Sequence, residues 1–453
     1  MMKYLFVLAA LLLSACMPRL FPPQVAIHDH YIYAENFSQD TLSIDSCWWH
    51  LFGDSTLDSL IDRALANNRN LAIAASRVQE VRAERVVSRA QYLPQIGVGL
   101  SAQGNRTKTT GLEQSYSLEP SLSWEVSLFG ALRHTERGAR AQIESAEWAW
   151  RSMRLSVAAE VATTYFTLLE YERDLFLARR STTLRRESAA LIDSMFRYGM
   201  SDGVALAQAR SLVHSAESDI PRYERAIEQT RLSLFVLLGE TPRPAVLQGS
   251  GKPLLSDHRP VDIPVGLPAQ LLMRRPDIRE SRANLLVAAT KVGIAHSARF
   301  PAITLTAQGG VASTSLKGLT AVDPWAWSSM GKLVEPVFAF GKLKRAEQAS
   351  VERYKQAALA YEQTVLTALS DVEAALVSID FYRLQTIQYS QLVAENDRIA
   401  TMTQALYRNG FSDYLSVIDA QRELYDSQMQ LVNLIAQQYI NYINLCKALG
   451  GGW

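Results

Sequence analysis

Along the 453-residue chain, long stretches with helical spacing alternate with shorter stretches in which apolar and polar residues take turns. Helices are predicted over residues 57–90 and 271–298, which are rich in Ala, Leu, Arg and Glu, residues that favour helices. Pro94 and Pro301 follow these two stretches and break the helical pattern. The pattern therefore predicts two similar helices, each followed by a different kind of structure.

Two much longer helical stretches follow, and they end at Gly199 and Gly410 without an internal proline. About 65 residues of helix would extend to about 100 Å, because the rise is about 1.5 Å per residue. Globular helices average only about 11–12 residues. Such lengths indicate a coiled coil or a helical barrel rather than a compact domain. A final helix in each half is predicted to end at Gly239 or Gly450, and Pro221 should kink or break the first of these.

One-by-one alternation predicts four strands, at about 96–105, 118–128, 303–311 and within 325–340, the last with poor alternation. In the second strand, Glu119 and Glu125 fall on the polar side. The pattern fits an antiparallel sheet with one wet face. It fits equally well a transmembrane barrel with a polar lumen, at about ten residues per strand.

The second half of the chain repeats the first. Gly199 and Gly410 are separated by 410 − 199 = 211 residues, and Gly239 and Gly450 by the same 211. Upstream, the residue pairs Leu93-Pro94 and Phe300-Pro301 are separated by 207. A recurring offset of this kind indicates tandem duplication. We expect a first repeat over 55–240, a linker over 241–267 and a second repeat over 268–453.

The N-terminus has the pattern of a secretory signal, predicted over residues 1–15. Lys3 precedes an apolar run over 4–13 that is too short to span a bilayer. The run ends in Leu13-Ser14-Ala15-Cys16, which resembles the lipobox of bacterial lipoproteins. Cys16 is therefore the predicted lipid anchor and mature N-terminus, followed by an extended segment over 16–54. The remaining cysteines, Cys47 and Cys446, are far apart in sequence and are expected to be thiols.

Composition narrows the choice of function. The formal charge is +1, with 48% hydrophobic and 20% charged residues, which does not indicate a nucleic-acid partner. The sequence contains no phosphate-binding glycine loop, no His-Glu-x-x-His and no nucleophile elbow. His28-Asp29-His30 lies in the extended N-terminal segment, and no metal site is expected there. We expect no catalytic residue and no cofactor.

Four strands cannot close a barrel in lipid, where unpaired edges leave backbone groups without hydrogen bonds. The smallest membrane barrels have about eight strands. If the strands lie in a membrane, several chains must pool them.

The sequence resembles the TolC-like outer-membrane factors of bacterial tripartite efflux pumps, in particular the lipoprotein branch that serves resistance-nodulation-division transporters. The most specific motif is Arg274-Arg275-Pro276-Asp277-Ile278, for which a structural role is expected. The resemblance extends over the mature chain, with the following further landmarks: Trp49, Phe52-Gly53-Asp54, Tyr92-Leu93-Pro94, Trp124-Glu125-Val126, Phe129-Gly130, Pro336-Val337-Phe338 and Ala448-Leu449-Gly450.

The resemblance implies an α+β membrane protein. Each chain would be internally duplicated, and three chains would form a homotrimer. Four strands per chain would make a 12-stranded barrel in outer-membrane lipid, continuing into a long periplasmic helical barrel. Glu119 and Glu125 would then face the lumen. The implied function is a passive conduit for small molecules, with a periplasmic adaptor protein and an inner-membrane resistance-nodulation-division transporter as partners.

The same resemblance suggests two groups of site residues. The turns after the long helices would contact the adaptor through Gly199, Ser201, Asp202, Gly410, Ser412 and Asp413. Ser416 and Asp419 match the family positions that constrict the periplasmic entrance. Because only one of the two is acidic, the predicted constriction is a ring of three Asp419 carboxylates.

Two other functions remain open from the sequence. One is a duct for type I protein secretion, which uses the same architecture. The other is a periplasmic coiled-coil spacer without a pore, which would contain the long helices but would not need the alternating strands.

Overall fold

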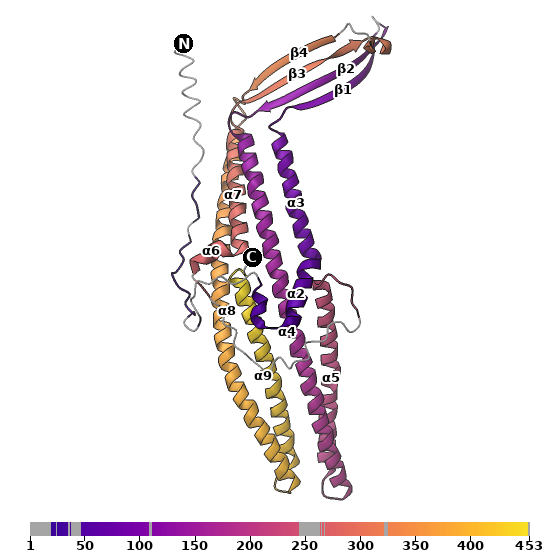
Figure 1. Ribbon diagram of the computed structural model, residues 1–453, viewed down its shortest axis with the longest axis vertical. Helices are drawn as coiled ribbons and strands as arrows, with labels where there is room; N and C mark the ends of the chain where they lie inside the picture. Colours follow the sequence, from indigo (N-terminus) through magenta and orange to yellow (C-terminus); the bar gives the residue numbers. More distant parts are fainter. Residues whose placement is uncertain are drawn as a thin grey trace. The chain divides into compact units, whose positions relative to one another are not determined.

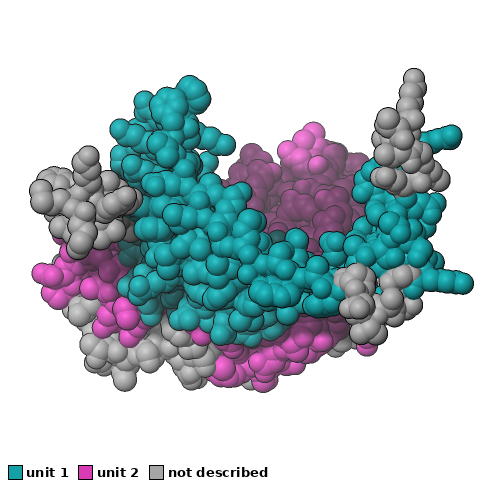
Figure 2. All heavy atoms as spheres, turned by 90° about the horizontal axis from the view of Figure 1, so that it is seen from above, with its two compact units in different colours: residues 1–25, 75–148, 279–364 teal, residues 26–74, 149–278, 365–453 magenta. Residues whose placement is uncertain are grey.

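A computed structural model describes residues 20–23, 25–34, 37, 47–107, 111–243, 263, 265, 266, 268–320 and 325–451. These residues form two compact units, coloured separately in Figure 2. Unit 1 contains residues 75–148 and 279–364 with the described residues up to 25, and unit 2 contains residues 26–74, 149–278 and 365–451. Each unit therefore draws on both halves of the sequence.

The sheet of unit 1 is a four-stranded antiparallel meander in the order β1-β2-β3-β4 (Figure 1). The strands are β1 (Gln95–Thr107), β2 (Gly111–Val126), β3 (Ala302–Ser313) and β4 (Trp325–Val334). β4 ends at Val334, earlier than the expected range to residue 340, and a 3₁₀ turn η3 (Leu316–Thr320) lies between β3 and β4. The central pair, β2 and β3, comes from different repeats.

The register gives this sheet two chemically different faces. Leu122 lies opposite Ile96 on one side and Ala307 on the other, while Glu125 lies opposite Thr304. Since paired residues share a face, the alternation predicted for single strands extends across β1, β2 and β3, whereas β4 also places Met330 and Val334 on the polar side. The apolar face carries Ile96, Val98, Leu100, Leu118, Leu122, Trp124, Ile303, Leu305, Trp325, Trp327 and Leu333, and the polar face Ser101, Ser117, Glu119, Ser121, Ser123, Glu125, Thr304, Thr306, Gln308, Ser328 and Lys332.

The helices repeat as closely as the sequence. The first half contains α2 (Ser55–Asn67), α3 (Arg69–Ala90), α4 (Ala131–Arg197) and α5 (Gly203–Leu237). The second half contains α6 (Leu271–Arg274), α7 (Pro276–Ser297), α8 (Lys342–Arg408) and α9 (Tyr414–Ala448), with 3₁₀ turns η1 (Trp48–Phe52) and η2 (Pro268–Gln270) before the two halves. α3 and α7 have 22 residues each, α4 and α8 have 67, and α5 and α9 have 35.

The prediction of one continuous helix at the start of each half was wrong. Asn68 separates α2 from α3 because its backbone is extended and its side-chain oxygen caps α3, accepting from the N–H groups of Asn70 and Leu71. Arg275 separates α6 from α7 because it precedes Pro276, whose ring disfavours the helical conformation at the residue before it. The two breaks lie 207 residues apart, the offset of the upstream landmarks.

A glycine packs against each of these breaks in unit 2. A Cβ at Gly239 would lie 2.3 Å from the carbonyl oxygen of Asn67, and one at Gly450 would lie 2.9 Å from that of Arg274. Both glycines also have positive φ, 66° and 94°, which glycine adopts without a steric cost. The same close backbone contact thus ends each half of unit 2.

Arg275, in the most specific motif, is buried at the centre of a hydrogen-bond network. Its guanidinium donates to the carboxylates of Asp277 and Asp371 and to the carbonyl oxygens of Ala368 and Ala448. These contacts join α6 and α7 to α8 and α9. The role of this motif residue is structural, as expected.

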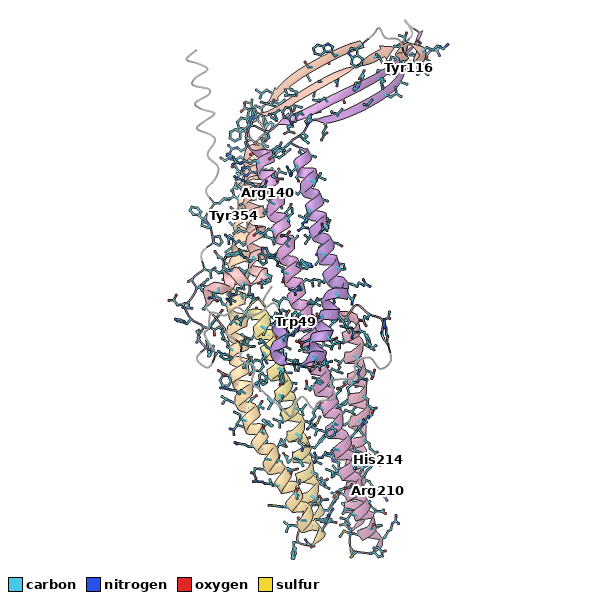
Figure 3. The ribbon with its side chains drawn as sticks, in the orientation of Figure 1. Trp49, Tyr116, Arg140, Arg210, His214 and Tyr354 are labelled. Carbon is cyan, nitrogen blue, oxygen red and sulfur yellow. The ribbon has the colours of Figure 1, made fainter. Side chains whose placement is uncertain are left out.

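The remaining differences are local. α5 continues through Pro221, so the predicted break is absent, and buried Ala216 and Tyr223 anchor the helix on both sides of the proline. Trp48 and Trp49 of η1 are buried in a segment that was expected to be extended (Trp49 in Figure 3). Within the described ranges, no helix combines the length and the apolar character needed to span a bilayer.

Candidate functional site

Two tight turns of unit 2, one after α4 and one after α8, have the same geometry. Gly199 and Gly410 occupy the left-handed region, with φ of 72° and 77°. In each turn the glycine N–H and the following N–H bond back to the helix, the second from Met200 to the Met195 carbonyl and from Phe411 to the Leu406 carbonyl. This is the Schellman pattern that ends helices at glycine.

Asp202 and Asp413 begin the helices that leave these turns. Asp202 accepts a hydrogen bond from the N–H of Ala205 at 2.7 Å, and Asp413 accepts one from the N–H of Ser416 at 2.9 Å. The Ser416 hydroxyl also donates to Asp413, and this bond, with that from the backbone, holds the pKa of the Asp413 carboxyl below its usual value. Both aspartates therefore have a capping role, whatever else they contact.

An apolar cluster holds the two turns side by side. It combines Ile192 and Leu206 of the first hairpin with Tyr414, Val417 and Ile418 of the second. The Tyr407 hydroxyl lies 3.6 Å from the Met195 sulfur, across the same contact. Within the first hairpin, Arg210 of α5 contacts the carboxylate of Asp193 at 3.0 Å (Arg210 in Figure 3).

The turns carry large apolar side chains on their outer surface. Tyr198 and Phe411 are each 80% exposed, and Met200, Val204 and Leu415 are exposed as well. Such a concentration of apolar side chains is unusual on a free surface and typical of a contact site. Ser201 and Ser412 lie between these apolar residues and the capping aspartates.

Ser416 and Asp419 are both exposed and one helical turn apart on α9, on a face that does not enter the cluster. The Oδ1 atom of Asp419 lies 3.9 Å from Nη1 of Arg422, at the edge of an ion pair. A carboxylate held this loosely is available to solvent.

The other predicted positions are more scattered. Glu119 and Glu125 lie on the polar face of the sheet. Cys16 lies outside the described residues, and no disulfide joins Cys47 to Cys446. In the described part of the chain, no three His, Cys, Asp or Glu side chains gather as metal ligands.

Three buried charged residues on α4 were not predicted. Glu170 and Asp174 are buried one turn apart, and Glu170 accepts a hydrogen bond from Asn433 at 2.9 Å. Burial and the nearby Glu170 raise the pKa of Asp174 to about 7. Further along α4, Arg185 is buried beside Tyr425. The i, i+4 spacing of Glu170 and Asp174 is visible in the sequence. The sequence does not show that this face of the helix is buried.

The chain matches a known protein family over most of its length. The model of the outer membrane efflux protein family matches residues 60–240 and 267–451. The chain belongs to this family. It is accordingly an outer-membrane channel of an efflux pump, located in the outer membrane.

Individual relatives match along most of their length. The solvent efflux pump outer membrane protein SrpC of Pseudomonas putida is 36% identical over 419 residues, which cover 89% of this chain and 86% of SrpC. The probable outer membrane lipoprotein SilC of Salmonella typhimurium is 29% identical over 463 residues, covering 100% of this chain and 99% of SilC. Among solved structures, the open state of the Neisseria gonorrhoeae MtrE outer membrane channel matches with a TM-score of 0.84 and 26% identity, covering 96% of this chain and 98% of MtrE.

Proposed function

We propose that three copies of the chain pool their sheets into one 12-stranded barrel and that their helices form one continuous duct. The observation that carries this proposal is the sheet of unit 1, in which β1, β2 and β3 share one apolar and one polar face, while β4 carries apolar side chains on both. In lipid, such a sheet needs strand partners at both edges, because unpaired backbone groups are costly there. The lumen would be polar, with Glu119 and Glu125 on its wall.

The duct is passive, without a catalytic residue or cofactor, and it carries small molecules delivered by an inner-membrane transporter through a periplasmic adaptor. SrpC is named as part of a solvent efflux pump, and similarity to it favours small-molecule cargo over secreted proteins. The two-faced sheet argues against a spacer without a pore. The transporter partner is of the resistance-nodulation-division class.

The adaptor binds at the two turns. The exposed apolar side chains around Gly199 and Gly410 form its contact surface, and the capping aspartates, Asp202 and Asp413, hold the turns in shape. Ser201 and Ser412 offer hydroxyl groups beside them.

The periplasmic entrance is gated at Ser416 and Asp419. Three Asp419 carboxylates around an axis attract cations and narrow the pore. Asp419→Ala should raise single-channel conductance in planar bilayers and weaken block by multivalent cations about tenfold, equivalent to about 1.4 kcal/mol. The measurement compares current–voltage curves with and without a trivalent cation.

Glu395→Ala on α8 is the matched control, because it removes another exposed carboxylate of a helical i, i+3 ion pair. It should leave conductance and cation block unchanged. Equal conductance and block in Asp419→Ala and the parent protein would place the constriction elsewhere.

Cys16 anchors the mature protein to the outer membrane by diacylation, in keeping with the lipobox-like sequence and the lipoprotein name of SilC. Mass spectrometry should find an acylated N-terminus at Cys16. Cys16→Ala should abolish acylation and leave the protein in the membrane, because the barrel itself is held by lipid. An unmodified N-terminus at another residue would rule out the anchor.

A further inference from the structure

The guanidinium group of Arg185 on α4 is buried without a direct ion pair among the described residues, although Asp219 and Asp426 lie near enough to favour its charge. Its exposed fraction is 6%. Nη1 donates to the Leu212 carbonyl at a long 3.4 Å, the group stacks 5.4 Å from the ring centroid of Tyr425, and Nε is buried without a hydrogen-bond partner. Among the described residues, no carboxylate forms an ion pair with Arg185. A buried charge is costly unless it is paired, so this arrangement needs an anion or water.

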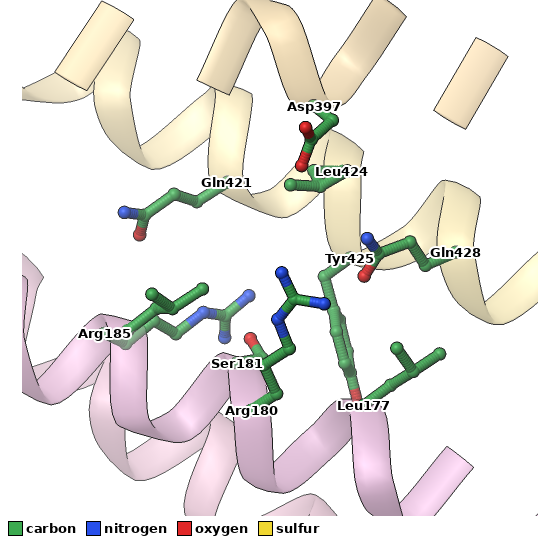
Figure 4. A pocket seen from close by; sticks show the side chains of 10 residues that line it. Leu177, Arg180, Ser181, Arg185, Asp397, Gln421, Leu424, Tyr425 and Gln428 are labelled. Carbon is green, nitrogen blue, oxygen red and sulfur yellow. The ribbon is translucent and has the colours of Figure 1, made fainter. Parts of the chain in front are cut away.

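A cavity of about 60 Å³ lies beside this group, lined by residues of α4, α8 and α9 (Figure 4). The guanidinium groups of Arg180 and Arg185 both line it and point toward one another. Both positive charges attract a negative group placed in the cavity.

The wall opposite the two arginines also offers a donor. Gln421 lines the cavity, its Nε2 donates to the Ser188 hydroxyl at 3.2 Å, and its Oε1 is buried without a partner. A hydroxyl both donates and accepts, so the amide can turn over and keep its bond to Ser188. In that orientation the NH₂ group faces the cavity.

The size of the cavity and the N–H donors that line it determine which ligand can bind. The cavity holds a few waters, so it admits a small ion and is too small for a nucleotide. Guanidinium and amide N–H groups are the donors that bind anions. Asp397 lies exposed at the rim and weakens the attraction, and no ion pair joins it to Arg180 among the described residues.

We propose that this cavity is a binding site for one small monovalent anion, chloride or a carboxylate as small as formate. The anion is held by Arg185 and Arg180 and by the amide of Gln421. Because α4 and α9 belong to different helical hairpins, the bound anion fastens the two hairpins together. The site is independent of transport and of the gate.

Thermal unfolding of the purified full-length protein tests this site. The unfolding midpoint should be higher in sodium chloride or formate than in sodium gluconate of equal ionic strength, because gluconate is too large for the cavity. The expected rise is on the order of one degree for each tenfold increase in chloride above the dissociation constant. Arg185→Gln should remove this difference.

Two further variants sharpen the result. Arg179→Gln, which removes an exposed neighbour paired with Glu224, should keep the chloride effect. Asp397→Asn should shift it to lower chloride concentration, because a competing negative charge is gone. A chloride effect that persists in Arg185→Gln, or equal midpoints in chloride and gluconate for the parent protein, would overturn the proposal.

Crystals of the parent protein soaked in bromide give a test that does not depend on a folded variant. Anomalous scattering between the guanidinium groups of Arg180 and Arg185 would support the site. Only water density at that position would overturn it.

Discussion

The surroundings of Asp174 disfavour the ionised form of its carboxyl group. It is buried between helices of unit 2, Oδ1 has no hydrogen-bond partner among the described residues, and Glu170 lies one turn away. Burial also raises the pKa of Glu170, although the hydrogen bond from Asn433 opposes this. A pair of buried carboxyl groups can avoid mutual repulsion by keeping a proton.

Since folding raises the pKa of Asp174 from 3.8 to about 7, the folded state binds a proton that the unfolded state releases. The contribution of Asp174 to stability is therefore complete below about pH 4 and is lost as the pH rises to about 7. Asp174→Asn should raise the free energy of unfolding at pH 8 by about 2–4 kcal/mol per chain, and by much less at pH 5.

Unfolding midpoints of the parent and Asp174→Asn from pH 5 to pH 8 measure this effect. Glu187→Gln on the exposed side of α4 is the control and should follow the parent at every pH. If the difference between Asp174→Asn and the parent does not change with pH, Asp174 is ionised throughout.

The sequence alone predicts some of the residues discussed above and misses others. Gly199, Gly410 and the aspartates after them were predictable, because turn and capping chemistry is local. Arg185 and Asp174 were not, because α4 has charged residues on all sides and periodicity alone does not identify its buried face. That face is determined by packing against α5 and against α9, which lies far along the chain.

The same order of helices occurs in both halves of the chain, so most helix boundaries occur in matching pairs. The glycines that end α4, α5, α8 and α9 were readable from the sequence, and so was the proline that follows α3. The breaks at Asn68 and Arg275 were missed, although the polar run over 67–70 and the proline at 276 mark them in the sequence. Pro221 does not break α5, because tertiary packing compensates for one lost hydrogen bond.

The helix-ending glycines should differ sharply in their tolerance of a side chain. At Gly410 an added Cβ has nothing within 4 Å, so Gly410→Ala should cost only the left-handed strain, about 1–2 kcal/mol. At Gly239 the Cβ would meet the Asn67 carbonyl at 2.3 Å. Gly239→Ala should therefore cost several times more, because two backbone segments must separate.

Unfolding midpoints of the two alanine variants and the corresponding asparagine variants measure this contrast. Asparagine tolerates the left-handed region, so Gly410→Asn should recover most of the stability lost in Gly410→Ala, whereas Gly239→Asn should recover none. Equal losses at both glycines would show that the close contact at Gly239 is not maintained.

The two edge strands of the sheet need strand partners if the sheet lies in lipid. In one chain β1 and β4 are the outer strands of the meander. They are separated by three strand spacings, about 14 Å, which is beyond the reach of a disulfide. A barrel of three chains would place β4 of one copy beside β1 of the next.

Cysteine pairs across these edges give a direct test of the trimer. In the chain's register, Ser101 of β1 shares the polar face with Ala326, Ser328 and Met330 of β4, and Trp327 is on the other face. Side chains alternate strictly between faces, so barrel closure preserves this division whatever the stagger between copies. Ser101→Cys combined with a cysteine at 326, 328 or 330 should yield a covalent trimer in at least one combination.

The background is a chain with Cys47→Ser, and the readout is a denaturing gel under oxidising conditions. Cys446 can stay, because complete burial raises the pKa of its thiol far above the usual value and shields it from oxidants. Ser101→Cys with Trp327→Cys is the matched control and should remain a monomer, since the two thiols lie on opposite faces. A covalent trimer from one polar-face pair, reversed by reductant, requires that β1 and β4 of different copies are neighbours. Monomers from all three polar-face pairs would mean that the strands are not pooled in this way and that the edges are covered by something other than a second copy.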